Sequence, residues 1–176
     1  LLASYYKSYE EDYNHLKKHV QVWDVAVERQ VSLKGPDAVN LMRQMSTRDI
    51  DQMAADQCCY TPICDHKGGM LNDPVAIKIA EDHFWLSTAD GDLLQWALGL
   101  AVGQGLDVEI EEPDVSPLAV QGPKASELMS RVFGDIVHTI KFFRYKRLSF
   151  MDTDFVVARS GWSKQGLSLI HISEPT

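Results

Sequence analysis

The stretch Leu33-Lys34-Gly35-Pro36-Asp37-Ala38 returns later in the chain as Val120-Gln121-Gly122-Pro123-Lys124-Ala125. Each copy joins an extended, alternating segment to a helical pattern through Gly-Pro. Glycine permits the turn, and proline is tolerated at the first helical position, where its missing N–H costs nothing. The repeat therefore predicts two α+β units of related build.

Hydrophobic periodicity and turn residues extend this pattern along the whole chain. Helices are predicted for residues 8–20, 38–45, 90–102 and 126–133. Strands are predicted for residues 22–25, 29–34, 57–63, 74–79, 83–87, 108–111, 117–121, 147–151 and 155–158. Ser8 and Asp90 are the expected N-caps, and residues 65–69 and 152–154 the expected turns. Because hairpins mix with single helices, the expected fold class is α+β, with mixed or antiparallel sheets.

The two ends of the chain differ in character from the rest. The chain begins Leu1-Leu2, without an initiator Met. Its last ten residues, 167–176, resemble the translation of a transposase sequencing adapter, and a segment of that origin is not expected to contribute to the fold. We expect a fragment cut at both ends with a non-native tail, and the alternative is a genuine C-terminal tail.

The composition is that of a globular protein, with 45% hydrophobic and 24% charged residues. The formal net charge is -8, without a stripe of Lys and Arg, so nothing in the charge favours nucleic acid or an anionic membrane as a partner. No apolar run approaches the ~20 residues that cross a bilayer.

Cysteine and histidine give no sign of a disulfide framework or a metal site. The three cysteines, Cys58, Cys59 and Cys64, are odd in number and fit a reducing compartment, so a cytoplasmic location is expected. Their spacing matches no zinc pattern. His15 and His19 share a helix face, but Leu16 stands where a metalloprotease motif has Glu. No metal is expected.

The chain contains no nucleotide-binding fingerprint, P-loop or Gly-x-Ser-x-Gly motif. The first candidate site residue is Asp73, at the end of the turn that runs from Gly68 into Pro74. Pro74 pushes Asp73 into extended geometry, which fixes the direction of its carboxylate. The carboxylate could accept a hydrogen bond from a protonated ring nitrogen or balance a cation, and the alternative is a turn cap.

Two further candidates lie at strand ends. In the run 159–166, Trp162 offers an aromatic face for a cation, worth ~2 kcal/mol when desolvated, and Lys164 could hold a carboxylate. Onium ligands with methyl groups suit such a face because they have no N–H for a salt bridge. The alternative is a packed Trp162 and a solvated Lys164. Ser87 could donate to a carboxylate or cap the turn that follows it.

Four stretches, in order, resemble the folate-dependent methyltransferase family typified by the glycine cleavage T-protein (aminomethyltransferase): 22–25, 33–38, 69–73 and 119–125. Within the family, residues 10–17, 20–25, 72–75 and 159–166 are most similar to the dimethylsulfoniopropionate demethylases. The T-protein usually has Arg-Thr-Gly-Tyr-Thr-Gly-Glu at 159–165 and two acids at Asn72-Asp73. These departures count against an aminomethyltransferase that acts on a lipoyl carrier protein.

The resemblance implies part of a three-domain, folate-binding fold. Residues 1–35 and 116–166 would form an incomplete first domain, and residues 36–115 the second, inserted domain. The third domain and the strand that should follow Gly166 would be absent, so the chain alone is expected to be inactive.

The resemblance also implies a reaction, the transfer of a methyl group from a small sulfonium substrate to N5 of tetrahydrofolate. Asp73 would be the catalytic and folate-binding residue, Trp162 would face the sulfonium, and Ser87 and Lys164 would orient the substrate carboxylate. Another folate-dependent one-carbon transferase and a non-catalytic folate-binding scaffold are the alternatives. A homodimer is left open.

Overall fold

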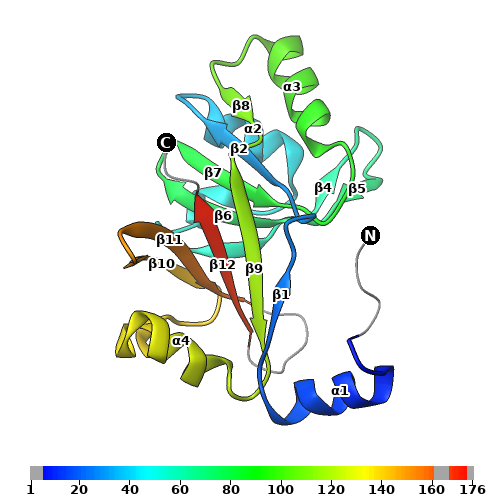
Figure 1. Ribbon diagram of the computed structural model, residues 1–176. Helices are drawn as coiled ribbons and strands as arrows, with labels where there is room; N and C mark the ends of the chain where they lie inside the picture. The colour runs from blue at the N-terminus through cyan, green and yellow to red at the C-terminus, as the bar shows by residue number, and fades with distance from the viewer. Residues whose placement is uncertain (1–5, 161–166, 174–176) are drawn as a thin grey trace. The chain divides into compact units, whose positions relative to one another are not determined.

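The structure is a computed structural model, and it describes residues 6–160 and 167–173 (Figure 1). The chain divides into two units. Unit 1 comprises Leu1–Val25 and Ser116–Thr176, and unit 2 comprises Ala26–Val115. Residues 26–35, expected in the first domain, belong to unit 2 because their strand pairs within its sheet.

Unit 1 contains a five-stranded sheet in the order β1-β9-β12-β11-β10. Its elements are α1 (Tyr9–Lys18), β1 (Gln21–Asp24), β9 (Val115–Gln121), α4 (Ala125–Phe133), the 3-10 helix η2 (Asp135–Thr139), β10 (Arg144–Phe150), β11 (Thr153–Arg159) and β12 (Leu167–Ser173). Val120, Met129, Val157 and Ile170 belong to its apolar core, which α4 and η2 cover. The predicted N-cap of α1 is confirmed, because Ser8 Oγ accepts from the Glu11 amide at 3.2 Å.

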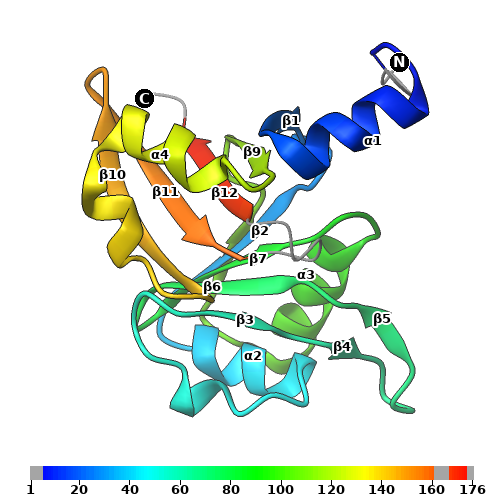
Figure 2. The ribbon, with the colours of Figure 1, turned by 90° about the horizontal axis from the view of Figure 1, so that it is seen from below.

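Unit 2 contains a five-stranded antiparallel sheet in the order β3-β6-β7-β2-β8 and the hairpin β4-β5. Its elements are β2 (Gln30–Lys34), α2 (Ala38–Met45), the 3-10 helix η1 (Ile50–Gln52), β3 (Cys58–Tyr60), β4 (Ile63–Cys64), β5 (Met70–Asn72), β6 (Val75–Ala80), β7 (His83–Ser87), α3 (Leu93–Gln104) and β8 (Glu109–Glu111). Both α2 and α3 cover one face of the large sheet (Figure 2). Val31, Leu33, Phe84 and Leu86 point to that face and are buried. The alternate residues of these strands point to the opposite face.

The predicted repeat is confirmed in both units. Gly35 and Gly122 have φ of +138° and +124°, and their carbonyls accept from Ala38 N and Ala125 N at 3.0 and 2.9 Å. In each turn the amide two residues after the glycine donates to a distant carbonyl at 3.2 Å, that of Asp107 or His19. The helices begin at Ala38 and Ala125, so each proline lies in the turn and not at the first helical position.

Three local predictions were wrong. Helix α3 begins after Asp92, and Asp90 instead accepts from Asn72 and Thr88 through its backbone carbonyl. The predicted strand 57–63 is divided into β3 and β4, since Pro62 lacks an N–H for a sheet ladder. The turn between β10 and β11 is made by Met151 and Asp152, both with positive φ.

Residues 167–173 form a strand, although the sequence led us to expect none after Gly166. Strand β12 pairs antiparallel with β11, with Phe155 opposite Ile172 and Ala158 opposite Leu169. Ile170 is buried in the core of unit 1. Residues 167–173 are rich in Leu and Ile, and an apolar segment of this length favours a strand wherever a sheet edge is available.

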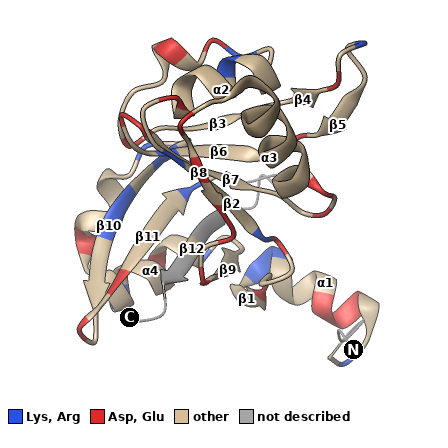
Figure 3. Ribbon diagram, turned by 90° about the horizontal axis from the view of Figure 1, so that it is seen from above, with Lys and Arg blue, Asp and Glu red and all other residues tan. Residues whose placement is uncertain are grey.

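Charged residues are interspersed along the described ribbon, and basic ones gather on β10 as Arg144, Lys146 and Arg147 (Figure 3). Cys58, Cys59 and Cys64 are free thiols. Among residues 6–160 and 167–173, no cluster of three His, Cys, Asp or Glu side chains could hold a metal. No helix of this described part is long and apolar enough to span a membrane.

Candidate functional site

One row of residues crosses the end of the unit 2 sheet on the face opposite α2 and α3. Gln30 is paired with Ser87, Ser87 with Val75, and Val75 with Tyr60, so the row runs over β2, β7, β6 and β3. Asp73 lies two residues before Val75, which is the first residue of β6. The structure thus brings Asp73 and Ser87, predicted from separate motifs, to the same end of one sheet.

Ser87 accepts a hydrogen bond from Gln30, a residue that the sequence did not single out. Gln30 Nε2 donates to Ser87 Oγ and to the backbone carbonyl of Glu28, both at 3.0 Å. Gln30 is 1% exposed and Ser87 9% exposed. The alternation of Gln30 and Ser32 with Val31 and Leu33 predicted a strand with one polar face. It gave no sign that this polar face is buried.

The Asp73 carboxylate is exposed and makes no hydrogen bond or ion pair with another described residue. The alternative role as a turn cap therefore gains no support from the described contacts. Burial raises the pKa of the Tyr60 hydroxyl, and the negative charge of Asp73 raises it further. Asp73 and Tyr60 are therefore electrostatic neighbours, and the carboxylate remains available to accept from a ligand.

A hydrogen-bonded clip joins the segments on either side of Asp73 and Ser87. Asn72 Nδ2 donates to the Asp90 carbonyl at 2.6 Å. The single hydroxyl hydrogen of Thr88 is shared between two acceptors, Asn72 Oδ1 and the same carbonyl, which lie 2.9 and 2.8 Å from Thr88 Oγ1. Thr88, not Ser87, therefore stabilises the turn that follows β7. An acid in place of Asn72 could not donate to Asp90.

Glu28 supplies a pH-dependent prediction, since burial raises the pKa of its carboxyl. The folded state then binds a proton more tightly than the unfolded state, so stability falls as pH rises through the unfolded pKa of ~4.3 toward the raised folded value. We expect Glu28→Gln to raise the free energy of unfolding at pH 7, by less than about 1 kcal/mol because solvent screens a half-buried group. Urea unfolding at pH 4 and pH 7 measures the change.

The control is Glu109→Gln, at an exposed position of β8. In this variant, the difference in the free energy of unfolding between pH 4 and pH 7 should equal that of the unsubstituted chain. If Glu28→Gln did the same, the buried carboxyl would have no influence on stability.

Two predicted residues, Trp162 and Lys164, lie outside the described residues. Arg159, the first residue of the run 159–166, makes one side-chain and one backbone hydrogen bond. Its Nη1 donates to the Ile140 carbonyl at 3.2 Å, and its own carbonyl accepts from Phe143 N at 2.7 Å. Arg159 thus joins the end of β11 to the loop between η2 and β10.

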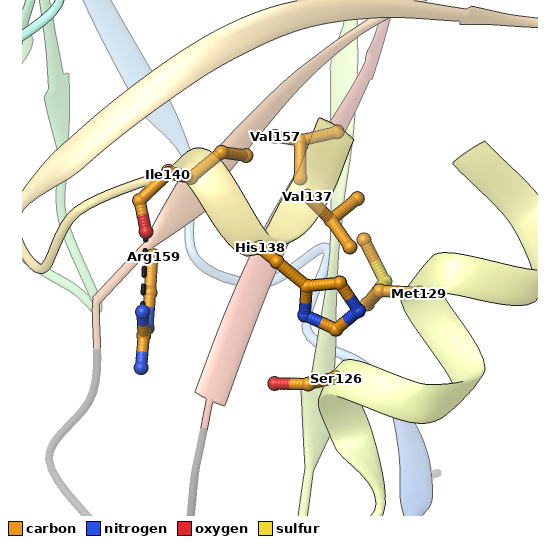
Figure 4. A pocket seen from close by; sticks show the side chains of 7 residues that line it. All are labelled: Ser126, Met129, Val137, His138, Ile140, Val157 and Arg159. Carbon is orange, nitrogen blue, oxygen red and sulfur yellow. Dashed lines mark hydrogen bonds between the residues drawn. The ribbon is translucent and has the colours of Figure 1, made fainter. Parts of the chain in front are cut away.

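A small hollow of about 80 Å³ lies beside Arg159, among α4, η2 and β11 (Figure 4). Its lining residues are Ser126, Met129, Val137, His138, Ile140, Val157 and Arg159. The hollow is too small for a large organic ligand.

The family model described as the GCVT N-terminal domain matches residues 2–166. The chain is 66% identical over 166 residues to "Dimethylsulfoniopropionate demethylase DmdA" of Ruegeria pomeroyi, covering 94% of this chain and 46% of that protein. It is 28% identical over 156 residues to an aminomethyltransferase of Alkaliphilus metalliredigens, covering 86% and 42%. The chain therefore spans about half the length of the curated relatives it matches.

Among solved structures, the chain is similar to the glycine cleavage system aminomethyltransferase T of Bartonella henselae. The TM-score is 0.80 at 20% identity, over 93% of this chain and 44% of that one. This likeness supports the predicted α+β fold class.

Proposed function

Because the chain belongs to the family of the GCVT N-terminal domain, with a match over residues 2–166, we propose that it forms part of a tetrahydrofolate-dependent dimethylsulfoniopropionate demethylase. The observation that carries this proposal is the 66% identity to the Ruegeria pomeroyi demethylase, against 28% to an aminomethyltransferase. The enzyme would be a methyltransferase that moves a sulfonium methyl group to tetrahydrofolate.

The described residues fit a folate ring. The exposed Asp73 carboxylate can accept hydrogen bonds from ring N–H groups, and Tyr60 beside it provides an aromatic, partly buried neighbour. Tetrahydrofolate would supply N5 as the acceptor of the methyl group. In this proposal Asp73 binds and orients the ring, which makes it the catalytic residue.

Three residues would hold the substrate, namely Ser87, Trp162 and Lys164. Trp162 faces the sulfonium, which carries methyl groups and no N–H. Ser87 and Lys164 hold the carboxylate at the other end. A sulfonium is already a good leaving group, so these residues need little acid–base chemistry. Their work is to align the reacting atoms and to exclude water.

The test is a chimera in which residues 1–166 replace the matching part of the Ruegeria pomeroyi demethylase. Consumption of dimethylsulfoniopropionate that depends on tetrahydrofolate, at a rate within about tenfold of that enzyme, is the expected result. The 176-residue chain, assayed alone under the same conditions, is expected to show no turnover. A chimera that folds but does not demethylate would overturn the proposal.

An aminomethyltransferase remains the second candidate, since the fold is shared with aminomethyltransferase T. The clip around Asn72 disfavours it, because Asn72 donates to Asp90 where the T-protein usually has an acid. The chimera should therefore show no aminomethyl transfer to a lipoyl carrier protein. A folate-binding scaffold would bind folate and turn over neither substrate.

The proposal includes a cytoplasmic location and leaves a homodimer open. Three free thiols are compatible with a reducing compartment. Fractionation of the source cells tests the location, and sedimentation of the chimera tests the dimer.

Trp162→Ala in the chimera separates the two ligands. Loss of a desolvated cation–π contact of ~2 kcal/mol corresponds to a loss of about 30-fold in affinity for the sulfonium. Affinity for tetrahydrofolate should change less than threefold. Isothermal titration with each ligand measures both constants, and Trp23→Ala is the control. Equal losses for the two ligands would argue against a contact between Trp162 and the sulfonium.

A further inference from the structure

Gln30 has only one orientation that suits its neighbours. The backbone carbonyl of Glu28 can only accept a hydrogen bond, so the amide nitrogen, and not the oxygen, must face it. The two hydrogens of Nε2 are then both assigned, one to the Glu28 carbonyl and one to Ser87 Oγ, each at 3.0 Å. A flip of this side-chain amide would place Gln30 Oε1 against the backbone carbonyl oxygen of Glu28. Because both atoms only accept, the amide keeps its orientation.

The orientation of Gln30 fixes the role of the Ser87 hydroxyl. Because Ser87 Oγ accepts from Gln30, its single hydrogen must point elsewhere. Gln30 and Ser87 are paired on neighbouring strands and are 1% and 9% exposed, so neither side chain has room to reorient. Ser87 thus has a hydroxyl hydrogen that Gln30 does not use and that can donate to another group at this end of the sheet.

The second polar atom of Gln30 points to a ligand. Oε1 is buried and has no hydrogen-bond partner among the described residues. A buried polar atom without a partner is costly, so such an atom is commonly satisfied by water or by a bound group. A carboxylate also only accepts, so it would be joined to Oε1 through a water that donates to both.

We infer that Gln30 is a positioning residue for the substrate carboxylate: it holds Ser87 as a hydrogen-bond donor, and Ser87 binds the carboxylate. This inference rests on the proposed function and assigns to it a residue that acts through another. Its hallmark is non-additivity, since removal of Gln30 should have no effect on substrate binding once the Ser87 hydroxyl is gone.

The experiment compares Gln30→Met, Ser87→Ala and the double variant in the chimera. We expect each single variant and the double variant to raise KM for dimethylsulfoniopropionate by about tenfold. Both kcat and the KM for tetrahydrofolate should stay within twofold. The matched control is Gln57→Met, at the other end of β3, where Gln57 Oε1 accepts from Ala54 N. It should leave both KM values within twofold.

A measurement without substitutions covers the case in which a variant does not fold. In the unsubstituted 176-residue chain, both Nε2 hydrogens of Gln30 should exchange with solvent at least tenfold more slowly than those of an exposed glutamine, as seen by NMR. Exchange at the rate of an exposed amide would overturn the inference.

The outcomes distinguish the role of Gln30 from the proposed function of the chain. A substrate KM unchanged by Gln30→Met, or raised by it a further tenfold on top of Ser87→Ala, would overturn the role of Gln30 and leave the demethylase intact. An unsubstituted chimera that consumes no dimethylsulfoniopropionate would overturn the proposed function, and with it the ligand assigned to Ser87.

Discussion

Replacing Gly122 by alanine is expected to destabilise unit 1 by about 3 kcal/mol or more. Gly122 has φ +124°, a conformation that L side chains rarely adopt, and an added Cβ would lie 2.2 Å from the backbone oxygen of His19. That oxygen cannot move away cheaply, because it accepts from Lys124 N at the end of α1. The position of the Cβ is fixed by the backbone of residue 122, and the oxygen belongs to the backbone of His19. A change of side-chain rotamer therefore cannot relieve the clash.

Unfolding in urea, followed by circular dichroism, measures this loss. Gly103→Ala is the matched control, because Gly103 lies inside α3 and a Cβ there would meet nothing within 4 Å. It should stabilise the chain by ~0.5–1 kcal/mol, since alanine is the better helix former. A Gly122→Ala chain as stable as the original would show that the turn can be rebuilt without glycine.

Replacing Asp73 by asparagine in the chimera is expected to lower kcat/KM for tetrahydrofolate by about 10- to 100-fold. The substitution keeps the shape of the side chain and removes its charge. A hydrogen bond to a charged group contributes ~1.5–3 kcal/mol, and 1.4 kcal/mol corresponds to a factor of ten. Steady-state rates at a saturating concentration of the sulfonium measure the effect.

Asp114→Asn is the control for charge, because Asp114 is an exposed loop residue of unit 2. It should leave kcat/KM within twofold. In the 176-residue chain, Asp73→Asn should also lower the pKa of Tyr60, since the negative charge of Asp73 raises it. A lowered Tyr60 pKa with unchanged kinetics would show that Asp73 is a neighbour of Tyr60 and not a ligand of folate.

The sequence predicted the elements that depend on local chemistry. Ser8 caps α1, and both Gly-Pro turns close onto alanines that begin helices, because each needs only residues close in sequence. The fold class followed from the order of these elements and from the family resemblance. Predicted element boundaries were wrong where residues distant in sequence determine the local structure. Asp90 is an example, because its backbone carbonyl accepts hydrogen bonds from Asn72 and Thr88.

The candidate site was predictable in part. Asp73 and Ser87 were found from a turn motif and a strand end, and register then placed both at one end of the same sheet. Gln30 could not be found in this way, because its burial depends on what covers the face opposite α2 and α3. A glutamine that alternates with Val31 and Leu33 reads as solvated until that face is known.

The discontinuity of unit 1 has a consequence for the order of folding. Unit 2 is one continuous stretch, Ala26–Val115, so it can fold as soon as that stretch has been synthesised. The two parts of unit 1 are joined where Val25 N donates to the Pro117 carbonyl at 3.2 Å. If unit 2 folds first, its two ends are already close together, and little loop-closure entropy remains to be lost when β1 meets β9. Substitutions that slow unit 2 should therefore delay both units, whereas Gly122→Ala should delay only unit 1.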